Sequence, residues 1–189
     1  MKDRCKIVVI GGSAGSFNIV RKILSNLPQD YSIPVVLCLH RLKEYRNGFV
    51  ESLNFGKGLK VTEPLDKDPV KAGNAYLSPA NYHLLVECTR TFALSTEEEV
   101  NFSRPSLDLT FETVARSYRD GVTAILLSGA NKDGAKGIHF CHREGAFTII
   151  QDPDEALFRA MPQEALRIFK PDKIWKTQEI IDYLKVLNR

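Results

Sequence analysis

The chain has 189 residues, of which 43% are hydrophobic and 26% are charged, and its formal net charge is +3. This length and composition predict one globular domain whose core needs neither a disulfide nor a metal. The small net charge excludes a dedicated nucleic-acid binder. No apolar run reaches the roughly 20 residues of a membrane-spanning helix or the about 7–15 of a signal peptide. We therefore expect a cytoplasmic protein.

Cysteine usage predicts a reducing compartment. The four cysteines are scattered, and no two of them have the C-x-x-C spacing of a redox or zinc site. Cys38 and Cys88 fall in apolar runs. We expect both to be small buried side chains rather than redox or metal ligands.

Strands and helices are predicted to alternate from the start of the chain. A β-branched run over 6–10 indicates a strand, and apolar spacing over 16–27 indicates a helix. Residues 35–39 are apolar without interruption. Such strands are typical of a parallel sheet that is covered on both faces.

The middle of the chain has a different pattern. Three short extended runs, at 75–77, 83–86 and 91–94, are separated by turn residues. Closely spaced runs of this kind predict antiparallel hairpins.

Alternation then resumes to the end of the chain. Further elements are predicted as helices at 107–118 (with Ser106 as N-cap), 135–143, about 163–169 and 178–187, and as strands at 122–127 and 146–150. The predicted fold is a single α/β domain over residues 1–189, with a mostly parallel, doubly wound sheet and an antiparallel hairpin insertion in the middle.

The first predicted strand ends in a glycine-rich turn, Gly11-Gly12-Ser13-Ala14-Gly15-Ser16. A dinucleotide fingerprint fails here, because serines stand at its second and third glycine positions. The G-x-S-x-G pattern fits, and the helix after it offers N–H groups to a developing oxyanion. A serine nucleophile and an ordinary phosphate-binding turn both remain open at this point.

A serine nucleophile also needs a base and an acid. His40 follows the predicted strand at 35–39, and Asp133 follows the one at 122–127. Because sites in α/β sheets assemble at the carboxyl ends of strands, both residues are expected beside Ser13. Ser13, His40 and Asp133 therefore form a candidate triad, although an Asp-Gly turn would also explain Asp133.

Six motifs occur in order along the chain. They are Ile10–Gly15, Leu39-His40, Ser78–Leu84, Arg104–Phe111, Leu127–Gly137, and Gln151-Asp152 with Met161–Ala165. With these motifs the chain resembles the catalytic domain of the chemotaxis receptor methylesterases, the CheB-type family, over nearly its whole length.

This resemblance implies hydrolysis of glutamate γ-methyl esters on the methylated cytoplasmic helices of chemoreceptors, with release of methanol. It also implies deamidation of certain receptor glutamines. The family's triad maps onto Ser13, His40 and Asp133, and its backbone oxyanion contacts map near Ala14 and Ala130. No metal or cofactor is expected, and the protein is expected to associate with the membrane only through the receptors. Since family members usually carry a receiver domain, the chain is predicted to be a stand-alone enzyme or an excised domain.

The chain departs from the family pattern around the triad. The departures are Ala14 for Thr, Ser16 for Gly, Leu39 for Gln, Arg41-Leu42 for Met-Pro, and Ala130-Asn131 for Met-Gly. Arg41, with Lys43 and Arg46, is expected to attract an acidic surface or orient a carboxylate, and Arg104 to frame the substrate. A solvated helix face and a salt bridge within the loop fit these residues equally well.

Three other functions remain open on the sequence. The altered surroundings of the triad fit an esterase or amidase with a different target. They also fit a non-catalytic scaffold of the same fold. A nucleotide-binding domain is the third, although the missing glycines argue against it.

Overall fold

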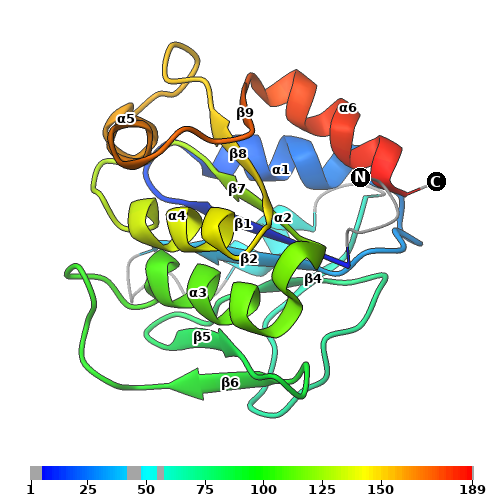
Figure 1. The fold of residues 1–189 in the computed structure, drawn as a ribbon. Helices are drawn as coiled ribbons and strands as arrows, with labels where there is room; N and C mark the ends of the chain where they lie inside the picture. The colour runs from blue at the N-terminus through cyan, green and yellow to red at the C-terminus, as the bar shows by residue number, and fades with distance from the viewer. Residues whose placement is uncertain (1–5, 42–47, 55–57, 189) are drawn as a thin grey trace.

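A parallel sheet forms the centre of the computed structural model, which describes residues 6–41, 48–54 and 58–188 (Figure 1). Its strands are β1 (Ile7–Gly12), β2 (Val35–Leu39), β3 (Val61–Thr62), β4 (Ala75–Leu77), β7 (Val122–Leu126), β8 (Phe147–Gln151) and β9 (Lys173–Trp175). Within the described ranges they lie in the order β3-β4-β2-β1-β7-β8-β9, and each pair is parallel.

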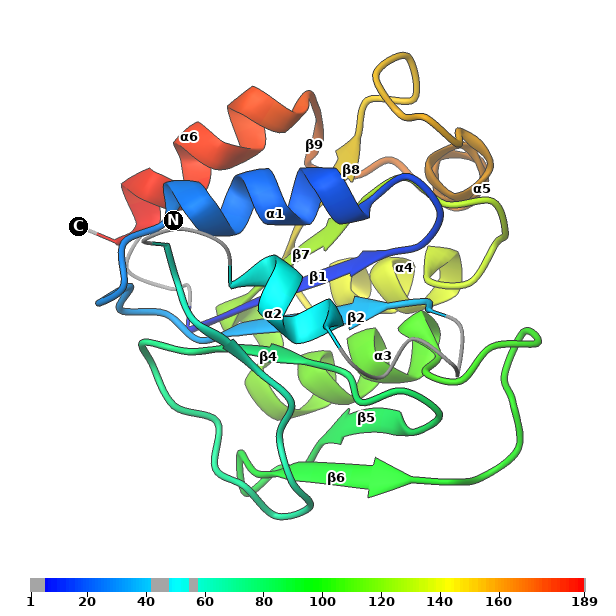
Figure 2. The same cartoon turned by 180° about the vertical axis from the view of Figure 1, so that it is seen from behind.

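Helices cover both faces of this sheet. On one face lie α1 (Phe17–Asn26), α2 (Phe49–Leu53) and α6 (Thr177–Leu187), as Figure 2 shows. On the other face lie α3 (Leu107–Tyr118), α4 (Ala135–Arg143) and α5 (Ala160–Ile168), and a 3-10 turn, Arg119–Gly121, joins α3 to β7. This arrangement confirms the predicted α/β fold. In the described part of the chain, every helix is too short or too polar to cross a bilayer.

The central strands form because their side chains are apolar on both faces. Every residue of β1, β2 and β7 is buried, so each strand contributes to both hydrophobic layers. β1 pairs with β2 on one side and with β7 on the other. β1 therefore lies between two parallel strands, and the carboxyl ends of these three strands lie side by side.

Gly11 in β1 leaves room for α3. A Cβ at this position would lie 2.7 Å from the ring of Phe111, which is fully buried. We expect Gly11→Ala to lower the free energy of unfolding by about 1–3 kcal/mol, because the ring has to move within a packed core. Thermal unfolding measures this, with Ser25→Ala on the exposed side of α1 as control. An unchanged Tm for Gly11→Ala would contradict this packing.

The middle of the chain is only partly the hairpin region that its sequence predicts. β5 (His83–Val86) and β6 (Phe92–Ser95) do form an antiparallel hairpin. The prediction that Ala75–Leu77 joins such a hairpin is wrong, since β4 lies in the main sheet, parallel to β2 and β3. A three-residue apolar run has no periodicity that distinguishes these two outcomes.

The hairpin packs against α3 through buried polar contacts. The His83 ring is fully buried, accepts a hydrogen bond from Ser106 N–H at Nδ1 (3.1 Å) and contacts the Glu98 carbonyl through Nε2 (3.0 Å). Thr110 donates its hydroxyl to the Leu84 carbonyl at 2.8 Å. These contacts hold the loop between β6 and α3 at the N-terminus of α3.

Two of the described cysteines are buried and one is exposed. Cys38 and Cys141 lie in the core, and burial raises the pKa of the Cys38 thiol to about 12. The prediction that Cys88 is buried is wrong, because β5 ends at Val86 and Cys88 lies exposed in the turn that follows. Cys5 is outside the described residues.

Candidate active site

Three loops at the carboxyl ends of neighbouring strands bring the candidate triad together. Ser13 directly follows β1, His40 directly follows β2, and Asp133 lies in the loop between β7 and α4. Backbone hydrogen bonds fix these positions: His40 N–H donates to the Gly12 carbonyl (3.2 Å) and Ser13 N–H to the Ser128 carbonyl (2.9 Å).

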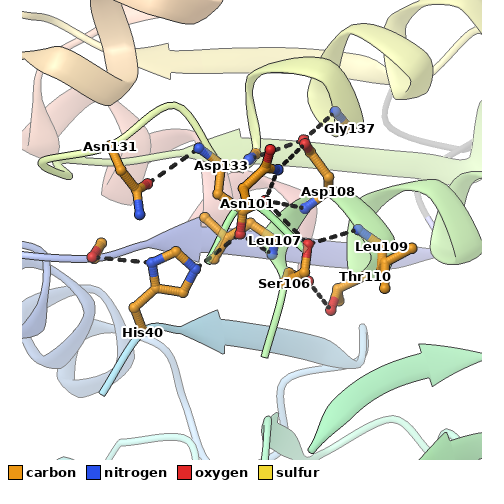
Figure 3. Close-up of polar contacts among 12 residues, drawn as sticks. His40, Asn101, Ser106, Leu107, Asp108, Leu109, Thr110, Asn131, Asp133 and Gly137 are labelled. Carbon is orange, nitrogen blue, oxygen red and sulfur yellow. Dashed lines mark hydrogen bonds and ion pairs between the residues drawn. The ribbon is translucent and has the colours of Figure 1, made fainter. Parts of the chain in front are cut away.

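The three side chains form one hydrogen-bonded chain. Ser13 Oγ lies 3.2 Å from His40 Nδ1, and His40 Nε2 lies 2.9 Å from Asp133 Oδ2 (Figure 3). An ionised carboxylate can only accept, so Nε2 carries the ring proton. Nδ1 then presents its lone pair to the serine hydroxyl, which is the arrangement that a general base requires.

Asp133 is fully buried at the N-terminus of α3. Its oxygens accept hydrogen bonds from His40 Nε2 (2.9 Å) and Leu107 N (2.6 Å) at Oδ2, and from Asn101 Nδ2 (2.9 Å), Ser106 Oγ (3.1 Å) and Asp108 N (3.3 Å) at Oδ1. Burial alone would raise its pKa. The hydrogen bonds from His40, Asn101 and Leu107 outweigh burial and hold the pKa of Asp133 below its ordinary value. The carboxylate is therefore ionised and fixed in place.

Sequence reasoning missed most of this surrounding ring. Ser106 is the N-cap of α3 as predicted, and its hydroxyl also donates to Asp133. The sequence predicts no role for Asn101 or Asp108. Asp108 lies within the Arg104–Phe111 motif and Asn101 three residues before it, which gives no indication that their side chains turn toward Asp133.

The turn that holds Ser13 is fixed by the next loop. Gly15 has a left-handed φ of 82°, which favours glycine, and a Cβ there would meet Ser128 Oγ at 2.8 Å. Ser128 Oγ contacts the Ala14 carbonyl at 2.9 Å, and Ser128 N–H donates to the buried Gln151 Oε1 at 2.8 Å. Gln151 belongs to the last of the six motifs, but the sequence predicts no role for it at the site.

A cavity of about 360 Å³ opens beside Ser13 and His40. Its lining consists of the nucleophile turn, the end of β2 and the start of two helices: Ser13, Ala14, Gly15, Ser16, Phe17, Leu39, His40, Arg41 and Phe49. Ala14, predicted as an oxyanion contact, is in this lining. Ala130, the other predicted contact, is exposed in the loop after β7.

Arg41 lines the cavity, but its side chain is only 2% exposed. The guanidinium pairs with Glu63, donates to the Ser78 carbonyl at 3.2 Å and lies 5.0 Å from the centre of the Phe49 ring. These contacts hold the guanidinium against Phe49, which also lines the cavity. Two other members of the predicted basic cluster lie outside the described residues: Lys43 and Arg46.

Arg104 makes its hydrogen bonds to neighbouring loops. Nε and Nη2 donate to Asn81 Oδ1 at 3.2 and 2.8 Å, and Nη1 donates to the carbonyls of Thr96 (2.6 Å) and Glu97 (2.8 Å). The guanidinium thus joins the loop after β4 to the loop after β6. Any framing of substrate by Arg104 would act through these loops.

Comparisons with known proteins agree on one family. The family model of the CheB methylesterase matches residues 8–184. A Hahella chejuensis relative named protein-glutamate methylesterase/protein-glutamine glutaminase 1 is 32% identical over 186 residues, which cover 95% of this chain and 50% of that protein. A Leptospira interrogans relative whose name gives the same two activities is 37% identical over 175 residues, which cover 93% of this chain and 91% of that protein. The crystal structure of the Thermotoga maritima CheB methylesterase catalytic domain matches with a TM-score of 0.91 at 28% identity, over 97% of this chain and 98% of that one. This chain belongs to the CheB methylesterase family.

Proposed function

We propose that this chain is a protein-glutamate methylesterase that hydrolyses glutamate γ-methyl esters on chemoreceptors and releases methanol. The observation that carries this proposal is the hydrogen-bonded chain of Ser13, His40 and Asp133 beside an open cavity. Membership of the family supports the substrate class. The cytoplasmic location, the single catalytic domain over residues 1–189 and the absence of a nucleic-acid partner, all predicted from the sequence, belong to the same proposal.

In the first step, Ser13 Oγ attacks the ester carbonyl while His40 Nδ1 takes the serine proton. Asp133 holds the ring in the required tautomer and stabilises the imidazolium. His40 then returns the proton to the methoxy oxygen, the C–O bond breaks, and methanol leaves. The glutamyl group remains as an ester on Ser13.

In the second step, His40 takes a proton from water, and the resulting nucleophile attacks the acyl-enzyme. The tetrahedral intermediate collapses, the proton passes to Ser13 Oγ, and glutamate is released. A glutamine side chain follows the same route with ammonia as the leaving group. This route supports deamidation as a second activity of the same site.

Backbone N–H groups are available for the oxyanion. The Ser13 N–H is already bonded to the Ser128 carbonyl, and the Gly129 N–H to the Phe158 carbonyl. Between described residues, no hydrogen bond uses the N–H of Ala14 or of Ala130. We assign these two groups as the oxyanion donors. Because these donors are backbone groups, alanine can supply them in place of the family's usual residues.

The test is mass spectrometry of a methylated chemoreceptor in native membranes, incubated with wild type or with Ser13→Ala. We expect wild type to convert γ-methyl glutamate to glutamate, and glutamine to glutamate at the same class of site. Ser13→Ala should leave both unchanged. Unaltered receptor peptides after incubation with wild type would contradict the receptor as substrate.

A panel of small carboxylic esters then separates the remaining functions. Ser13-dependent hydrolysis of these esters without receptor turnover would establish an esterase with another target. Equal rates for wild type and Ser13→Ala on every ester would establish a non-catalytic scaffold.

A further inference from the structure

The side-chain amide of Asn101 joins two carboxylates. Its Nδ2 lies 2.9 Å from Asp133 Oδ1 and 2.9 Å from Asp108 Oδ2 (Figure 3). An amide nitrogen has two hydrogens, so it can donate one to each carboxylate. The amide oxygen could not take this place, because it would face two acceptors.

Asp108 is held from its other side by backbone. Its Oδ1 accepts from Gly134 N–H at 2.9 Å and from Gly137 N–H at 2.7 Å, at the start of α4. Its backbone N–H also donates to Asp133 Oδ1 at 3.3 Å. Asp108 therefore fastens α3 to α4, and its second oxygen is left facing Asn101 and the acid of the triad.

Two carboxylates this close destabilise one another's charge. Burial, with the nearby charge of Asp133 adding to it, raises the pKa of Asp108, whereas the pKa of Asp133 is held low. Asn101 supplies a donor to both members of the pair. Without it, Asp133 Oδ1 would lose a hydrogen bond and would face the Asp108 carboxylate directly.

The backbone around Asn101 fixes the direction of its side chain. Asn101 has a left-handed φ of 52°, a conformation that asparagine adopts more readily than most residues. Reciprocal hydrogen bonds between Val100 and Ser103, at 3.2 and 3.0 Å, close the turn around it. This turn, in the loop between β6 and α3, thus directs the amide toward Asp133.

We propose that Asn101 is a positioning residue for the reaction, which keeps Asp133 oriented toward His40 by separating it from the Asp108 carboxylate. This inference rests on the proposed serine-hydrolase function. Beyond that function, it predicts that the effects of substituting Asn101 and Asp108 depend on each other. If Asn101 acts by separating two charges, removing the charge of Asp108 should compensate for the loss of Asn101.

The test measures the rate at which Ser13 reacts with a fluorophosphonate probe, which requires no knowledge of the natural substrate. In this reaction Ser13 Oγ bonds to phosphorus, fluoride leaves with the electron pair of the P–F bond, and His40 takes the serine proton. The variants are Asn101→Gly, Asp108→Asn and the double variant. Glycine is chosen because it adopts the left-handed backbone without strain. Asn74→Gly, in the loop before β4, is the matched control.

We expect Asn101→Gly to react with the probe about 10-fold or more slowly than wild type. The double variant should react at least about threefold faster than Asn101→Gly, because residues in contact couple energetically. Asn74→Gly should react like wild type. Thermal unfolding shows whether each variant is folded. Asn101→Ala, which removes the amide donor without adding a charge, replaces Asn101→Gly if that variant does not fold.

Two results would overturn the inference alone. They are a wild-type rate in Asn101→Gly, and a double variant whose loss equals the product of the two single losses. Failure of the probe to label wild-type Ser13 at all would instead overturn the proposed function. The two failures are therefore distinguishable.

Discussion

His40→Ala is expected to lower kcat for hydrolysis of a glutamate γ-methyl ester by about 10⁴–10⁶-fold, because Ser13 then has no base to accept its proton. His40 Nδ1 is positioned 3.2 Å from Ser13 Oγ for this transfer. The side chain is only 13% exposed, so thermal unfolding checks that the variant is folded. Steady-state kinetics on a methylated peptide measures the loss.

The double variant Ser13→Ala/His40→Ala provides the sharper comparison. Residues that act as a unit show strongly non-additive losses, so the double variant should be no slower than either single one. His139→Ala is the control. This histidine lies on α4, its ring stacks on that of Phe169 with the ring centres 5.1 Å apart, and it has no part in the proposed mechanism. Losses that multiply in the double variant would contradict a shared catalytic step.

Asp133→Asn is expected to lower kcat by about 10³–10⁴-fold. An asparagine amide can donate to His40 Nε2, and the ring proton then moves to Nδ1. In that tautomer Nδ1 has no lone pair for the Ser13 hydroxyl. The KM for the same methylated peptide should change little, because Asp133 is buried behind the ring and does not reach substrate. A raised KM with unchanged kcat would contradict this role.

The same substitution should also change how stability depends on pH. The pKa of Asp133 is lower in the folded protein than its ordinary value. Its ionised form therefore stabilises the fold above about pH 4, and this contribution is lost as the pH falls through the folded pKa. We expect the gap in unfolding free energy between wild type and Asp133→Asn to be largest near neutral pH and to narrow in acid. Urea unfolding at several pH values measures it, and a gap that widens in acid would contradict the assignment.

The elements that the sequence predicts best are those with long apolar patterns. β2, α3 and α4 have the bounds that were predicted for them, because fully apolar strands and strong helical spacing leave few alternatives. The sequence did not predict α2, β3 or β9. α2 has five residues and β3 has two, too few for a periodicity, and β9 is largely exposed. β4 pairs with β2, which is distant in the chain, so the sequence alone favours a hairpin with its nearer neighbours.

The site was predictable to the extent that it follows from strand ends. Parallel strands bring their carboxyl ends to one edge, and this places Ser13, His40 and Asp133 together. The orientation of the imidazole ring and the contact of Asn101 with Asp133 are different in kind. The first depends on the contacts of His40 with Ser13 and Asp133, and the second on how the loop after β6 packs at the N-terminus of α3. No local pattern encodes either.

The most direct test of the proposed function is methanol release from methyl-labelled chemoreceptor membranes, with wild type and Ser13→Ala assayed side by side. Labelled receptor is verified before and after the incubation. The hydrogen-bonded chain from Ser13 through His40 to Asp133 predicts release by wild type and none above background by Ser13→Ala. Release by both proteins at the same rate, or by neither, would contradict it.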